Sequence, residues 1–339
     1  SGVCENSSSY ADFQLIDFIP TGDFITLDNN TIRFSLGDYG WIGSNQFTTG
    51  QRKGVGFSYG SAGNLLYRGG IFCTDLATVR SGIGTDGSTD HDFFVRSRSN
   101  PWPYVLKISD SESQDAFKLG VTLQQTWSTI QPSLAQCDVV FTNESLDTWP
   151  AFAIGIFLDW DLTAMGDSCR VRRFIEAEPQ GSHGMAELMW RSPRQPVVGC
   201  LAMSDAPGAE GQAAGMGLDF MNDTGGFMAD ANKIRTLSSK DSIQASGFDD
   251  MSMVVGMKFS SIPPRASHRV RFVLGAAPSA DSLARMMQST GIITSVREDQ
   301  KLVTGASCSP NPAEEFVHIA IEDAVIASVV VRDINGHRV

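Results

Sequence analysis

The residues best placed to do chemistry are aspartates at the end of the apolar segment "GIFLDWDL". On an extended chain Asp159 and Asp161 point to one face, and Trp160 points to the other. Two carboxylates this close repel each other unless a cation or an arginine lies between them. Calcium prefers oxygen ligands, and Asp167 follows in the next loop. We therefore predict a calcium site at Asp159, Asp161 and Asp167, with the alternative that these acids bind backbone amides and nearby arginines such as Arg170 and Arg172.

Other catalytic patterns are weaker. Neighbouring acids on one strand seldom straddle a glycosidic bond, which disfavours a glycoside-hydrolase pair at Asp159 and Asp161. The acidic stretch from Gly82 to Phe94 lacks the spacing of an EF-hand and is interpreted as a solvated loop. The Ser182-His183 pair does not itself lie in a GxSxG motif, and no phosphate-binding GxxxxGK[ST] loop occurs in the sequence. The sequence therefore assigns no catalytic residue.

Tryptophans offer a different chemistry, because their rings can stack on sugars. They are Trp41, Trp102, Trp127, Trp149, Trp160 and Trp190. Exposed, coplanar tryptophans in a groove beside acids would indicate a carbohydrate-binding or carbohydrate-active domain. Buried tryptophans would indicate a non-catalytic accessory domain, and this is the interpretation that we favour.

Composition excludes some functions. The 339-residue chain carries a formal net charge of −12, which disfavours nucleic-acid binding, because that function needs a concentrated basic surface and the sequence shows no long basic stretch. No apolar run approaches the roughly 20 residues that cross a bilayer, so no membrane span is expected. The cysteines are widely spaced and leave the disulfide pairing open; they are Cys4, Cys73, Cys137, Cys169, Cys200 and Cys308. Glycosylation sequons start at Asn6, Asn29, Asn143 and Asn222.

Period-two alternation dominates the chain and predicts strands that bury one face. In Thr31–Leu36 the apolar residues alternate with polar ones, and His268–Ala276 shows the same pattern. Only Ser279–Gly291 reads clearly as a helix, with Ser279 as its N-cap, and a short polar helix is allowed near Asp230–Leu237. Strands without intervening helices predict a mainly β protein, a large antiparallel β-sandwich with one short helix.

The end of the chain reads as a separate small β-domain. The segment "SPNP" at Ser309–Pro312 disfavours helix and marks a boundary. An alternating strand over Phe316–Ile321 follows, and a second strand leads into Asn335-Gly336, a strong hairpin signal. We predict a sandwich domain at residues 1–300 and a truncated, immunoglobulin-like C-terminal domain at residues 301–339.

This tail resembles the C-terminal sorting domain of type IX secretion substrates from Bacteroidota. The matching residues are Pro310, Asn311, Pro312, Asp333, Asn335 and Gly336, in that order. The family's closing hairpin and basic end are lacking, so the domain is expected to be truncated. The resemblance implies type IX secretion machinery as a partner and a location that is secreted or on the outer cell surface.

The body is similar to a β-domain that lies between the catalytic and sorting domains of secreted, often subtilisin-like, Bacteroidota proteins. The likeness covers Ile32–Gln288 and includes "SLGDYGWIGSN" and "VVFTNESLDTWPAFAIGIFLDWDL". It implies an accessory β-sandwich of the supersandwich type, with an upstream catalytic domain in the parent peptidase precursor. It supplies no catalytic residues, and calcium is the one cofactor expected.

Overall fold

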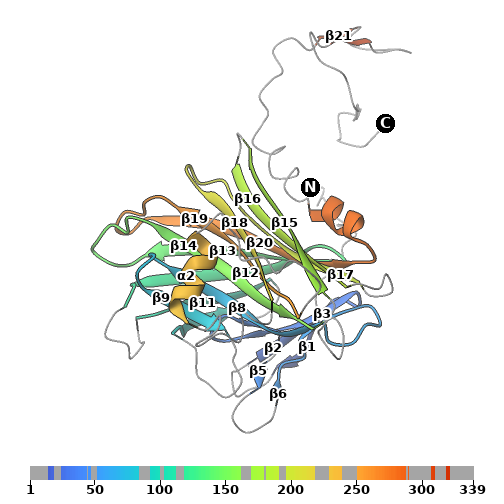
Figure 1. Cartoon of the computed structure of the whole chain (residues 1–339), viewed down its shortest axis with the longest axis horizontal. Helices are drawn as coiled ribbons and strands as arrows, with labels where there is room; N and C mark the ends of the chain where they lie inside the picture. Colours follow the sequence, from blue (N-terminus) through green and yellow to red (C-terminus); the bar gives the residue numbers. More distant parts are fainter. Residues whose placement is uncertain are drawn as a thin grey trace, which may run out of the picture. The chain divides into compact units, whose positions relative to one another are not determined.

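The structure is a computed structural model of the 339-residue chain (Figure 1). It describes residues 24–43, 54–83, 92–99, 103–111, 118–161, 196–217, 229–238, 250–287 and 289 with their side chains, and several further strands by their backbone. The chain divides into two compact units, Ser1–Thr290 and Gly291–Val339. In the second unit β21 (Ser307–Ser309) pairs with β22 (His318–Ala320), and the immunoglobulin-like tail stays a prediction.

The first unit contains a ten-stranded antiparallel sheet (Figure 1). Its strands, in spatial order, are β1 (Gln14–Phe18), β2 (Phe24–Asp28), β3 (Ile32–Gly37), β4 (Trp41–Ile42), β8 (Leu66–Thr74), β14 (Phe152–Trp160), β19 (Ser252–Phe259) and β18 (Glu210–Met216). β7 (Phe57–Tyr59) also pairs with β3, and β9 (Val79–Ile83) also pairs with β8.

A second antiparallel sheet has eight strands. Their order is β10 (Phe94–Ser99), β11 (Tyr104–Ser109), β12 (Val121–Gln131), β13 (Leu134–Asn143), β20 (Ser267–Ala277), β17 (Val197–Ser204), β16 (Gly181–Trp190) and β15 (Cys169–Glu178). A small separate pair joins β5 (Asn45–Gln46) to β6 (Arg52–Lys53). The predicted mainly β, antiparallel sandwich is therefore confirmed.

The main core lies between the two large sheets and follows the predicted alternation. In β3 the side chains of Ile32, Phe34 and Leu36 are buried in it, and β13 alternates between buried and half-buried positions along most of its length.

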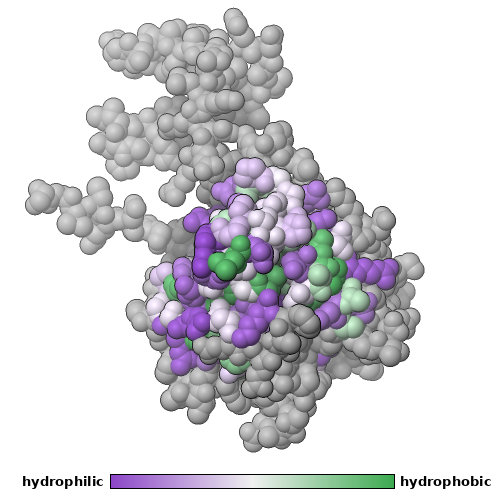
Figure 2. All heavy atoms as spheres, turned by 90° about the vertical axis from the view of Figure 1, so that its left-hand side faces the viewer, coloured by the Kyte–Doolittle hydropathy of each residue, from purple (hydrophilic) through white to green (hydrophobic). Residues whose placement is uncertain are grey.

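Among the described residues no helix is long and apolar enough to cross a membrane. Hydrophilic and hydrophobic residues are mixed over the described part of the face in Figure 2.

A second apolar layer explains why β14 is buried on nearly every residue. Helix α2 (Asp230–Ser238) packs on the outer face of β14, β18 and β19, and the short polar helix expected there is confirmed. Leu237 of α2 lies over Gly155 and Gly256, which are paired in register. A Cβ on Gly256 would lie 2.7 Å from Leu237 Cδ2 and 2.4 Å from the carbonyl oxygen of Ile154. Because these two glycines have no side chains, Leu237 of α2 can pack directly against the backbone of the sheet.

Gly256→Ala should lower the free energy of unfolding by about 1–3 kcal/mol, because the added methyl overpacks the contact between sheet and helix. Urea unfolding followed by circular dichroism would measure the loss. Gly63→Ala is the control, since a Cβ there meets no atom within 4 Å. Equal stability of the two variants would contradict this account of how α2 is seated.

The strongly predicted helix is also present, over residues 280–287. Ser279 caps it as expected, with its Oγ accepting a hydrogen bond from the Ser282 backbone N–H at 3.3 Å. Leu283 and Met287 are fully buried against Val273 of β20. This helix therefore covers the outer face of the eight-stranded sheet.

Candidate functional site

The sequence-predicted aspartate site centres on Asp159, near the end of β14. Arg68 of β8 and Ser252 of β19 lie opposite Asp159 on the two neighbouring strands. The Arg68 Nε donates to Asp159 Oδ2 at 3.0 Å, and the Ser252 Oγ donates to Asp159 Oδ1 at 2.7 Å. Both carboxylate oxygens therefore have protein donors, in a row across three strands.

Of the other two predicted calcium ligands, Asp161 and Asp167, the structure describes only Asp161. Asp161 lies beyond the end of β14, and its backbone N–H donates to the Leu65 carbonyl at 2.8 Å. Asp167 lies outside the described residues. No three His, Cys, Asp or Glu side chains gather as a metal site within the described part of the chain. The calcium site stays a prediction, in which the ion would share Asp159 with Arg68 and Ser252.

The tryptophans whose side chains the structure describes belong to the core. Trp41, Trp127, Trp149 and Trp160 are between 0% and 4% exposed. Their rings pack on core phenylalanines: Trp127 contacts Phe34, Trp149 stacks on Phe152, and Trp160 meets Phe57 edge-on. Trp102 and the side chain of Trp190 lie outside the description. The four described rings are therefore not available to stack on a sugar.

Two sequon asparagines are also buried. Asn29 accepts hydrogen bonds from the backbone N–H groups of Thr31 and Ile32 and donates to the Pro132 carbonyl. Asn143 is 0% exposed and donates from Nδ2 to three carbonyls, those of Asp147, Ile262 and Pro263. Neither amide can carry a glycan in the folded chain. Asn6 and Asn222 lie outside the described residues.

Three cysteines, Cys73, Cys137 and Cys200, are free and buried. Burial raises the pKa of each thiol, because it disfavours the charged thiolate. These thiols stay protonated at neutral pH and are poor nucleophiles. The side chains of Cys4, Cys169 and Cys308 are outside the description.

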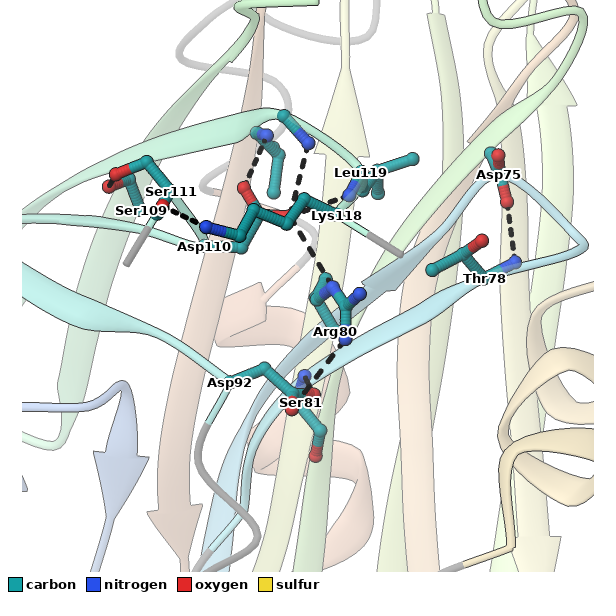
Figure 3. A network of polar contacts seen from close by, with 12 residues as sticks. Asp75, Thr78, Arg80, Ser81, Asp92, Ser109, Asp110, Ser111, Lys118 and Leu119 are labelled. Carbon is teal, nitrogen blue, oxygen red and sulfur yellow. Dashed lines mark hydrogen bonds and ion pairs between the residues drawn. The ribbon is translucent and has the colours of Figure 1, made fainter. Parts of the chain in front are cut away.

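The most developed polar arrangement joins the two sheets around Arg80 (Figure 3). Arg80 lies on β9 of the ten-stranded sheet, and its side chain is 4% exposed. Its Nε is 3.4 Å from Oδ2 of Asp110, which follows β11 of the eight-stranded sheet. Its Nη1 is 3.7 Å from Oδ1 of Asp92, which precedes β10 of that sheet. Arg80 is thus a buried cation between two carboxylates of the opposite sheet.

Backbone groups hold both carboxylates in place. Asp110 is fully buried and accepts hydrogen bonds from the backbone N–H groups of Leu119, Gly120 and Val121 at 2.7–3.0 Å. Asp92 Oδ2 accepts from the Ser81 N–H at 2.8 Å, and the Asp92 N–H donates to the Ser81 carbonyl. The backbone therefore fixes the position of both carboxylates, and their ion pairs with Arg80 connect the two sheets.

Of the other residues considered from the sequence, the structure places Asp92, and most of the rest lie outside the described residues. Asp92 was expected in a solvated acidic loop, whereas the structure places it in the Arg80 network. Ser182 and His183 lie on β16, with side chains outside the description. The sorting-motif residues Pro310, Asn311, Pro312, Asp333, Asn335 and Gly336 lie outside the described residues. No sequence signal identified Arg80 or Asp110, because their partners lie on other strands.

Comparisons with known proteins identify no family. No family model and no curated protein matches the chain. Heparinase III shares 7% identity with a TM-score of 0.37, over 80% of this chain and 38% of that chain. A polysaccharide lyase shares 12% identity with a TM-score of 0.32, over 80% of this chain and 33% of that chain. This chain spans 38% of the first structure and 33% of the second, and at these TM-scores the likeness assigns no activity.

Proposed function

We propose that this chain is a non-catalytic accessory β-sandwich of a secreted or cell-surface protein. One observation carries the proposal: the tryptophans, the aspartate and the thiols that the sequence offered for chemistry and the structure describes are used by the fold. The four described tryptophans are core residues, Asp159 is held by Arg68 and Ser252, and the buried thiols are protonated. The role that follows is structural, namely a rigid two-sheet body that spaces or supports a neighbouring domain.

The proposal extends to export by type IX secretion, with a subtilisin-like peptidase precursor as the parent protein. The support is the resemblance of the tail, through Pro310, Asn311, Pro312, Asp333, Asn335 and Gly336. Sequencing the gene across both ends of the chain tests this extension. A closing hairpin after Val339 and a catalytic domain before Ser1 are expected, and a frame with neither would overturn it.

Incubation of the purified chain with a panel of neutral and acidic polysaccharides tests the accessory role. Reducing ends would report hydrolysis, and absorbance near 235 nm would report the unsaturated products of a lyase. We expect neither signal above a heat-denatured control. Turnover that survives purification to homogeneity would instead establish the carbohydrate-active alternative.

A further inference from the structure

The outer face of the ten-stranded sheet carries a row of three polar side chains. Asp28 of β2 lies opposite Arg33 of β3, and Arg33 lies opposite Ser58 of β7. Directly opposed residues on antiparallel strands point to the same face. Ile32 and Phe34, which flank Arg33, are buried in the core on the other face. Asp28, Arg33 and Ser58 therefore lie side by side on the face away from the core.

These three side chains line a pocket of about 500 Å³. Asn30, Thr31, Asn64 and the half-buried Val55 and Ala62 contribute to its wall. The pocket is open beside Gly60 and Gly63, where an added Cβ would meet no atom within 4 Å. This size lies within the range of about 300–1,000 Å³ that is typical of small-molecule sites.

Arg33 supplies a positive charge, and within the described part of the chain no carboxylate forms an ion pair with it. Its Nε is buried and has no hydrogen-bond partner among the described residues. Asp28, although opposite, turns its Oδ1 to the Asn30 backbone N–H at 2.7 Å, and no ion pair with Arg33 forms in the described part of the chain. A buried guanidinium N–H without an acceptor is unfavourable, so the half-buried Arg33 side chain gains if it turns toward the pocket and binds a carboxylate side-on.

The neighbouring groups suit a ligand rich in hydroxyls. Asn64 Oδ1 accepts from the Phe57 and Leu66 backbone N–H groups, which leaves its Nδ2 as a donor for a ligand. Among the described residues the Ser58 hydroxyl donates one long hydrogen bond, of 3.5 Å, to the Arg33 carbonyl, and it can exchange this bond for a ligand hydroxyl. One arginine and one aspartate give the lining a formal charge of zero, which favours a single carboxylate over a polyanion.

We propose that this pocket binds a sugar acid, with the carboxylate on the Arg33 guanidinium and ring hydroxyls on Asn64, Ser58 and the second oxygen of Asp28. Val55 and Ala62 would pack against the C–H groups of the ring. Such a site goes beyond the accessory role and requires no catalysis. A free monosaccharide acid and a residue within a polysaccharide present the same chemistry to it.

Isothermal titration calorimetry of the full chain tests the site with four probes: sodium glucuronate, glucose, acetate and sulfate. Glucuronate should bind at least about ten-fold more tightly than the others, because only it offers both a carboxylate and hydroxyls. Arg33→Gln should weaken glucuronate binding by at least about ten-fold. The matched control is Arg269→Gln, an exposed arginine on β20, which should change binding less than about two-fold. Acidic oligosaccharides in place of glucuronate would distinguish a polysaccharide source from a free acid.

Asp28→Asn gives a second test that keeps the turn, because an asparagine Oδ1 can still accept from Asn30. The Asp28→Asn substitution should lower the ratio of glucuronate affinity to sulfate affinity, because it makes the pocket more positive. Equal binding of glucuronate, acetate and sulfate would show a plain anion site and overturn the proposal. Absence of glucuronate binding, or unchanged binding by a folded Arg33→Gln chain, would overturn it as well.

Discussion

Arg80→Met should lower the free energy of unfolding by about 3–5 kcal/mol, because it leaves two carboxylates of the opposite sheet without their cation. Asp110 is fully buried, so water cannot replace the guanidinium there. The three backbone N–H groups that bind Asp110 offset only part of the loss. Urea unfolding monitored by tryptophan fluorescence is suitable, because the four described tryptophans lie in the core.

Arg265→Met is the matched control, because it also removes an arginine from a carboxylate. Its Nη1 is only 2.8 Å from Glu144, a shorter contact than either Arg80 contact, but the two side chains are 64% and 43% exposed. The expected loss is below about 1 kcal/mol. If the two variants were equally stable, burial would not be what gives the Arg80 network its effect.

Asn143→Ala should cost about 3 kcal/mol, since it removes a buried side chain that hydrogen bonds to four residues. Its Nδ2 binds the carbonyls of Asp147, Ile262 and Pro263, and its Oδ1 accepts from both the N–H and the hydroxyl of Ser145. It thereby ties the end of β13 to the loop that connects β19 to β20. Asn143→Asp should be at least as harmful, because a carboxylate would face three carbonyl oxygens.

Thr142→Ala is the control next in sequence, since its hydroxyl makes one exposed hydrogen bond, to Ser267. Thermal denaturation of the three variants should place Thr142→Ala within a few degrees of the parent chain and the two Asn143 variants far below it. A parent-like melting temperature for Asn143→Ala would show that the loop does not depend on this side chain.

Alternation along single strands was enough to predict the fold class. Val270, Phe272 and Leu274 of β20 lie in the main core as their spacing indicates. Val273, on the other face, is buried as well, because the helix over residues 280–287 covers it. The capping signal at Ser279 predicted that helix, since a cap is a local interaction.

The functional residues were less accessible to sequence reasoning because their partners are distant along the chain. The acid pair at Asp159 and Asp161 suggested a cation, and the structure supplies Arg68, 91 residues away, as the cation beside Asp159. Asn143 carried a glycosylation signal that says nothing of its burial. The row at Asp28, Arg33 and Ser58 becomes visible only once the register of three strands is known.

The positions of β19 and β20 have a consequence for the order of folding. These consecutive strands enter the interiors of different sheets: β19 lies between β14 and β18, and β20 lies between β13 and β17. Their partners are far back in sequence, as with Asp138 and Arg271, which are 133 residues apart. Neither sheet can close until residues 252–277 have left the ribosome. The sandwich therefore assembles late and through non-local contacts, which makes its folding slow and leaves its earlier strands without their neighbours until then.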